Sequence, residues 1–185
     1  LHNGVNITNE FLDAVKEDKE WRLIDPKSKE AIKNVSARDL WWQLLHTRSE
    51  TGEPYIVNID NCNSALPQQQ KDLGLEVKQS NLCSEITLPT NEERTAVCCL
   101  SSVNVEKFDD WSKDEQFIED LVTMLDNVLE QFIESAVDTA HYALGSYRAN
   151  AERFKNYLKE DKNAYRKSAF SAYRERSIGL GAMGF

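Results

Sequence analysis

The residues best suited to chemistry in this sequence lie in one short stretch, where a cysteine stands between an amide and a carboxylate. Asn81, Cys83 and Glu85 are each separated by a single residue. In an extended or finger-like loop such side chains can point the same way, because side chains alternate with period two. A carboxylate can take a proton without a metal, and an amide orients a partner without competing for that proton. The spacing alone also fits a strand with a buried cysteine and two exposed polar neighbours.

The remaining cysteines are Cys62, Cys98 and Cys99. Four cysteines are too sparse for a secreted disulfide scaffold, and they lack the paired CxxC spacing of a structural zinc site. Cys98 and Cys99 are adjacent, which disfavours a thiol-redox protein that uses both, because a disulfide between neighbours is strained. We interpret Cys62 and Cys99 as structural residues.

Composition excludes several classes of protein. The chain has 185 residues, 41% of them hydrophobic and 29% charged, which is enough apolar material for one core. Its formal net charge of -9 argues against direct nucleic-acid binding, which needs a basic face, but not against nucleotide binding. No run approaches the roughly 20 apolar residues of a membrane span. We therefore expect a cytoplasmic protein with no membrane partner.

Two helices are predicted before the cysteine motif. Thr8 is a suitable N-cap for a helix whose apolar residues reach Val15. A turn is expected over 25–29, because Pro26 disfavours helix at the residue before it. Ser36 should begin a second helix that ends near Gly52. Its expected apolar face comprises Leu40, Trp41, Leu44 and Leu45. We interpret the aromatic cluster of Trp41, Trp42 and His46 as core rather than as a cofactor site.

Around the cysteine motif the sequence favours short strands. Residues 54–60 have the β-branched and aromatic content of a buried strand, followed by turn residues over 61–64 and a Gln-rich loop at 68–70. A second strand is expected over 95–100. Ser112 and Glu115 form a capping box for a long amphipathic helix, and residues 151–176 have helical composition. Helices alternating with short strands favour an α/β fold.

Longer blocks of sequence resemble the large, catalytic subunit of ribonucleotide reductases. The segment 79–90 is similar to the finger loop of that family, and 96–104 to the next barrel strand. The similarity extends to 51–56, to 60–63 and to the Gly-rich run 174–185, which resembles the family's next barrel strand. The resemblance implies part of a ten-stranded α/β barrel with a central finger loop, incomplete in this chain, with one barrel-domain fragment over 1–185. A helical insertion is expected over 137–167, where Gly145 interrupts the pattern.

The resemblance also assigns roles to four residues. Cys83 would form the thiyl radical that abstracts the ribose 3′ hydrogen, Glu85 would act as base on the 3′ hydroxyl, and Asn81 would orient by hydrogen bonding. Asn81 and Glu85 would thus contact the substrate, a ribonucleotide that the resemblance implies to be a diphosphate. Cys98 would be redox-active, forming a disulfide with a distant thiol as the 2′ hydroxyl leaves as water.

Other parts of the reaction would come from outside the chain. The resemblance implies as partners the remaining segments of the large subunit, a radical-generating small subunit, and a thioredoxin or glutaredoxin type reductant. We expect no cofactor and no metal bound by this fragment itself. A metal-bearing small subunit is favoured over adenosylcobalamin as the radical source. The alternative from another class is a non-catalytic helical interaction module, supported by the amphipathic helix after Ser112 and the acidic charge.

Overall fold

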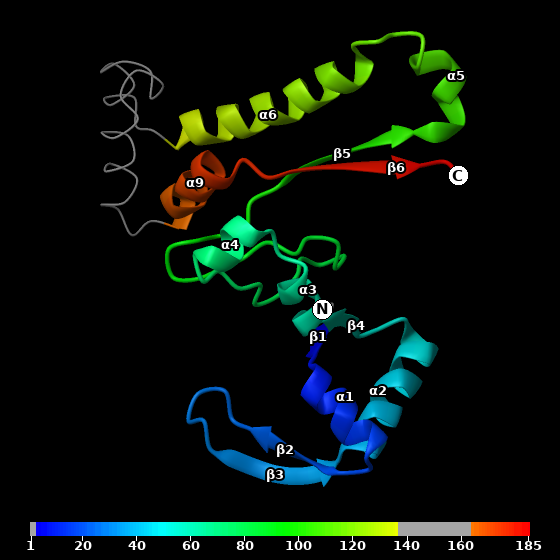
Figure 1. Ribbon diagram of the computed structural model, residues 1–185, viewed down its shortest axis with the longest axis vertical. Helices are drawn as coiled ribbons and strands as arrows, with labels where there is room; N and C mark the ends of the chain where they lie inside the picture. The colour runs from blue at the N-terminus through cyan, green and yellow to red at the C-terminus, as the bar shows by residue number, and fades with distance from the viewer. Residues whose placement is uncertain (1–2, 137–163) are drawn as a thin grey trace. The chain divides into compact units, whose positions relative to one another are not determined.

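The computed structural model describes residues 3–136 and 164–185 (Figure 1). These residues fall into two compact units, one ending at Thr90 and the other beginning at Asn91, and each is described by itself. The helical insertion expected over 137–167 lies outside the described residues except for its last four, which belong to a helix. The described strands form three two-stranded sheets rather than a closed barrel.

The first unit begins with a strand and a helix, and this strand pairs in parallel with a later one. Strand β1 (Gly4–Ile7) pairs in parallel with β4 (Tyr55–Asn58), in a register that places Gly4 opposite Tyr55. Helix α1 (Asn9–Lys16) follows β1, and the Thr8 hydroxyl accepts the Phe11 N–H at 3.2 Å, which confirms the predicted N-cap. The expected strand over 54–60 is confirmed in its central residues. Its partner β1 was not predicted.

A β-hairpin follows α1 and was also not predicted. Strands β2 (Glu20–Ile24) and β3 (Ala31–Ser36) are antiparallel. The turn between them confirms the expectation for 25–29, since the Asp25 carboxylate accepts the N–H groups of Lys27 and Ser28. Only β2 alternates between exposed and half-buried residues, whereas the first four residues of β3 are all exposed, so no period-two pattern marks both strands.

Helix α2 (Ala37–Thr51) has the predicted ends. The Ser36 hydroxyl accepts the Asp39 N–H at 3.1 Å, and Gly52 closes the helix at φ 79°, a conformation that favours glycine. Leu40, Trp41 and Leu44 pack on the core around Phe11, but Leu45 is exposed. The core interpretation of the aromatic cluster is wrong for Trp42, which is 65% exposed and stacks on His46.

Two short helices replace the loops expected after β4. Helix α3 (Ile59–Ser64) occupies the stretch expected to be a turn, and α4 (Gln68–Asp72) occupies the Gln-rich loop. Asparagine and serine favour turns by intrinsic preference. In α3, however, the Asn63 side chain bonds to the backbone elsewhere in the unit, so tertiary contacts outweigh that preference.

The second unit is a parallel strand pair covered by helices. Strand β5 (Cys99–Asn104) begins later than expected and pairs in parallel with β6 (Ile178–Met183), which confirms a strand in the Gly-rich run. A 3-10 turn η1 (Val105–Lys107) and helix α5 (Phe108–Trp111) follow β5. Helix α6 (Phe117–Ser135) starts after Gln116, so the predicted capping box is wrong: Ser112 ends α5 instead.

The core of the second unit lies between α6 and α9 (Ala164–Glu175). Leu129 and Ile133 are fully buried against Ala169 and Phe170. Helix α6 buries Leu125, Leu129 and Ile133, whereas its apolar residues Ile118 and Val128 are exposed. Figure 1 shows α6 running alongside β5 and β6. The helix expected over 151–176 is confirmed from Ala164 to Glu175, and its earlier part lies outside the described residues.

Candidate reaction turn and redox strand

The cysteine motif forms a tight turn in the first unit, not an extended segment. Leu82, Cys83 and Ser84 are turn and bend residues, and the Ser84 N–H donates to the Asn81 carbonyl at 3.1 Å. Ser84 has φ 65°, which is uncommon for a residue other than glycine. The period-two explanation is therefore wrong, because this reversal of the chain sets the directions of the side chains.

The turn brings two of the three motif side chains together. The Asn81 amide donates from Nδ2 to Glu85 Oε1 at 2.6 Å, and Asn81 Oδ1 accepts the Ile86 N–H at 3.0 Å. The Asn81 side chain therefore bridges the end of the turn and fixes the Glu85 carboxylate. The second Nδ2 hydrogen and the second carboxylate oxygen remain as a donor and an acceptor for a bound molecule.

Ser80 is a site residue that the sequence reasoning missed. Its hydroxyl donates to the Ile86 carbonyl at 2.7 Å, so the residues before and after the turn are tied together. Because serine is common in loops, its type carries little signal. Its position beside the motif was the only available indication.

Cys83 lies at the exposed tip of the turn. A cavity of about 280 Å³ adjoins the turn and is lined by Ser80, Asn81 and Ser84, with Tyr55 from β4. The lining offers hydroxyl and amide groups rather than a purely apolar surface. A thiol on the same turn as a hydrogen-bonded carboxylate and amide suits chemistry on a polar molecule.

The other sequence-predicted residue, Cys98, lies in the second unit immediately before β5. A Cβ added at Gly179 of β6 would lie 3.7 Å from Cys98 Sγ, which is ordinary contact, and the Leu100 side chain fills the nearer space at that glycine. Cys99 packs instead against the core between α6 and α9, and burial raises the pKa of its thiol. Neighbouring residues of a strand face opposite sides. This supports the structural interpretation of Cys99.

Cys62 lies apart from the motif, half-buried in α3. It adjoins a mainly apolar hollow together with Ala65, Leu66 and Leu88. These neighbours supply no acid, base or cation that would activate a thiol. The arrangement supports the structural interpretation of this cysteine.

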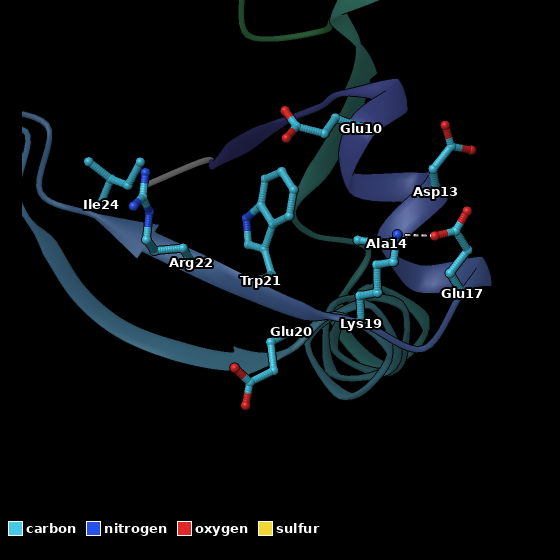
Figure 2. Close-up of a pocket in the computed structure, with 9 residues that line it drawn as sticks. All are labelled: Glu10, Asp13, Ala14, Glu17, Lys19, Glu20, Trp21, Arg22 and Ile24. Atoms are coloured by element: carbon cyan, nitrogen blue, oxygen red, sulfur yellow. Dashed lines mark ion pairs between the residues drawn. The ribbon is translucent and has the colours of Figure 1, made fainter.

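A larger hollow of about 640 Å³ lies between α1 and β2, away from the motif residues. Figure 2 shows Glu10, Asp13 and Glu17 on the helical side and Glu20 on the strand, around Trp21. Four carboxylates against the cations of Lys19 and Arg22 leave this surface acidic. Such a lining repels phosphate groups, so we do not assign nucleotide binding to it.

Two negative findings apply to residues 3–136 and 164–185. Among them, no three His, Cys, Asp or Glu side chains are grouped in a way that could hold a metal ion. Nor does any helix in these ranges have the length and apolar character needed to cross a membrane.

Comparisons with known proteins agree with the resemblance of the motif. The family model described as "Ribonucleotide reductase, barrel domain" matches residues 1–185. The putative ribonucleoside-diphosphate reductase large subunit of Frog virus 3 (isolate Goorha) is 45% identical over 186 residues, which cover 100% of this chain and 29% of that protein. The corresponding large subunit of Invertebrate iridescent virus 3 is 46% identical, covering 95% of this chain and 24% of its own length.

A solved structure shows the same similarity in three dimensions. The class Id ribonucleotide reductase alpha subunit of Actinobacillus ureae matches with a TM-score of 0.69 and 32% identity. The match covers 99% of this chain and 28% of that one. The chain thus spans less than a third of the length of these relatives.

Proposed function

This chain belongs to the ribonucleotide reductase barrel-domain family. We therefore propose that its turn over 81–85, here called the reaction turn, carries reacting groups of a ribonucleoside-diphosphate reductase. The hydrogen bond from Asn81 to Glu85, on the turn that carries Cys83, is the observation that carries this proposal. A hydrogen-atom carrier and a proton acceptor are then held on one turn. In this proposal the chain acts within the large subunit, together with its remaining segments.

The first step of the proposed reaction takes place at Cys83. A thiyl radical on its sulfur removes the 3′ hydrogen atom of the ribose, which forms an S–H bond and leaves a carbon radical on the sugar. The exposed place of Cys83 at the tip of the turn supports this role, since the sulfur must reach the substrate. The hydrogen atom returns to the same carbon at the end of the cycle.

Glu85 is the proposed base for the 3′ hydroxyl group. Its Oε1 accepts from Asn81, so the other oxygen can take the hydroxyl proton as the 2′ hydroxyl leaves as water. Asn81 holds this carboxylate and can use its second N–H to orient the ribose. The amide stays uncharged in both protonation states of the base, so it does not compete for the proton.

Cys98 is the proposed source of reducing electrons, together with a second thiol from elsewhere in the subunit. The two thiols give two electrons and two protons, and they become a disulfide as the ribonucleotide becomes a deoxyribonucleotide and water. Cys98 is half-buried rather than enclosed, which supports approach by a second thiol. A dithiol reductant of the thioredoxin or glutaredoxin type restores the pair.

The radical itself is proposed to come from a small subunit that carries a metal, not from adenosylcobalamin. The names of the viral relatives support a two-subunit enzyme, since they are large subunits. The cytoplasm, where a disulfide is reduced again after each turnover, is the proposed location.

The test compares three variants of the full-length large subunit with its small subunit, nucleoside diphosphate and reductant present. We expect Cys83→Ser and Glu85→Gln to lose turnover, and Cys99→Ser, the matched control, to retain it. Turnover is measured as deoxyribonucleotide formed per subunit. Equal activity in all three variants would refute the proposed function.

A further inference from the structure

We propose that Asn63 is a positioning residue for the reaction turn, acting through the backbone of Val77. This inference rests on the proposed function and deepens it. Asn63 belongs to α3, and Val77 belongs to the segment that leads into the turn. A side chain distant in sequence therefore positions the segment that leads into the reacting residues.

The contact is a two-way clamp on the backbone of one residue, Val77. Asn63 Oδ1 accepts the Val77 N–H at 2.8 Å, and Asn63 Nδ2 donates to the Val77 carbonyl at 3.1 Å. The same Nδ2 also donates to the Ile59 carbonyl at 3.1 Å, one turn earlier in α3. Both hydrogens and the oxygen of the amide are thus engaged, and the orientation of this side chain is fixed from two directions.

Asn63 supplies the Val77 backbone with hydrogen bonds of the kind that a neighbouring strand would provide. Residues 75–80 belong to no strand or helix, yet Val77 is only 1% exposed. Buried backbone groups need partners. Asn63 satisfies both groups of Val77, while Asn6 of β1 donates to the Lys78 carbonyl at 2.8 Å. On the other side of the turn, the Thr90 N–H donates to the Glu76 carbonyl at 3.2 Å.

Loss of the Asn63 hydrogen bonds would displace the turn without removing any of its reacting groups. An alanine at position 63 leaves the Val77 N–H and carbonyl buried without their partner, which favours displacement of the segment. Hydrogen-atom transfer needs the sulfur close to the 3′ carbon. A misplacement of about 1 Å can slow a positioned reaction on the order of 100-fold.

The experiment uses the full-length large subunit with its radical-generating partner. The variants are Asn63→Ala and Asn63→Ser, whose hydroxyl can keep one hydrogen bond, and the matched control is Asn61→Ala at an exposed position of the same helix. For each, kcat and KM for the nucleotide, the melting temperature, and the isotope effect on kcat of substrate deuterated at the 3′ carbon are measured.

We expect Asn63→Ala to lower kcat on the order of 10- to 100-fold, with KM changed less than about twofold. The isotope effect should rise, because hydrogen abstraction becomes slower relative to the other steps. Asn63→Ser should show a smaller change in the same direction. Asn61→Ala should match the unaltered enzyme in all four measurements.

Several outcomes would overturn the inference. Unchanged kcat in Asn63→Ala would do so, as would a fall in kcat with an unchanged isotope effect, since that indicates only fewer folded molecules. Failure of both Asn63 variants to fold would assign the residue to folding alone. Cys83→Ser is assayed in parallel: its retained turnover would refute the proposed function, whereas its loss beside a normal Asn63→Ala would refute only the clamp.

Discussion

The Asn81 amide donates to Glu85 Oε1 at 2.6 Å across a turn whose exposed tip carries Cys83. This bond joins two side chains whose spacing in sequence first suggested chemistry. Because the amide also accepts the Ile86 N–H, its oxygen points back into the turn and its nitrogen towards the carboxylate. The orientation of the proposed base therefore depends on a neutral neighbour.

Asn81→Asp tests that dependence through the pH profile of the full-length enzyme. The substitution places a second carboxyl group at hydrogen-bonding distance from Glu85, and two carboxylates so close share a proton. The shared proton then occupies the proposed base until the pH is raised further. We expect the acid limb of the kcat profile to move to higher pH, with activity partly regained as the pH rises.

Asn81→Ala is the matched control for this prediction, since it removes the amide without adding a charge. It should lower kcat without moving the acid limb upward. An Asn81→Asp enzyme whose pH profile coincides with that of Asn81→Ala would show that the two side chains do not interact during turnover.

Cys98 and Cys99 offer a second prediction, because their side chains have different surroundings. Cys98→Ser in the full-length enzyme should abolish deoxyribonucleotide formation while 3′ hydrogen exchange with solvent continues, since Cys83 is intact. Cys99→Ser should keep turnover within about twofold and lower the free energy of unfolding by about 1 kcal/mol, because a hydroxyl replaces a thiol against apolar neighbours. Tritium at the 3′ carbon and product analysis separate the two steps.

The assignment of Cys98 would be contradicted by normal product formation in Cys98→Ser. Loss of product in Cys99→Ser, at a temperature where that variant is folded, would transfer the redox role to Cys99.

Arg176 gives a prediction about stability. Its guanidinium binds the Asp126 carboxylate at 2.7 Å and Glu130 Oε2 at 3.0 Å, so it joins the end of α9 to α6. Its side chain is 29% exposed, which places the pair between surface and buried ion pairs. We expect Arg176→Ala to lower the free energy of unfolding by about 1–3 kcal/mol. Urea denaturation of the full-length subunit measures this.

Lys16→Ala is the matched control, because Lys16 pairs with Asp13 at 3.3 Å while both side chains are more than half exposed. It should change the free energy of unfolding by less than about 0.5 kcal/mol. Equal effects of the two substitutions would contradict the importance assigned to Arg176.

The local signals in the sequence identified helix ends well and strand partners poorly. Thr8, Ser36 and Gly52 act at helix ends as predicted, because capping depends on residues within one turn. Strand β1 has no such local mark, since its pairing with β4 joins segments far apart in the chain. The failed capping box at Ser112 has a related cause: α5, just before it, uses that residue as its end.

For the candidate site, residue types were predictable and geometry was not. A thiol, a carboxylate and an amide at fixed spacing indicated the chemistry, and the longer blocks indicated the family. The positive φ of Ser84 and the hydroxyl bond of Ser80 fall on residues of common type, so no pattern reveals them. The Asn63 clamp joins α3 to Val77, so it can be recognised only in the folded chain.

The last prediction concerns this 185-residue chain expressed alone. The strands among its described residues form two-stranded sheets, which are marginal in water without further strands or full helix cover. Leu100, Met183 and Phe185 are large apolar residues exposed on or beside the β5–β6 pair. A parallel strand is normally covered and paired on both sides. We therefore expect aggregation or a broad, weak thermal transition by size-exclusion and melting measurements, and improvement on mixing with the remaining segments of the subunit. A sharp, cooperative and monomeric transition of the chain alone would contradict this, because it would show that these exposed apolar side chains need no partner for stability.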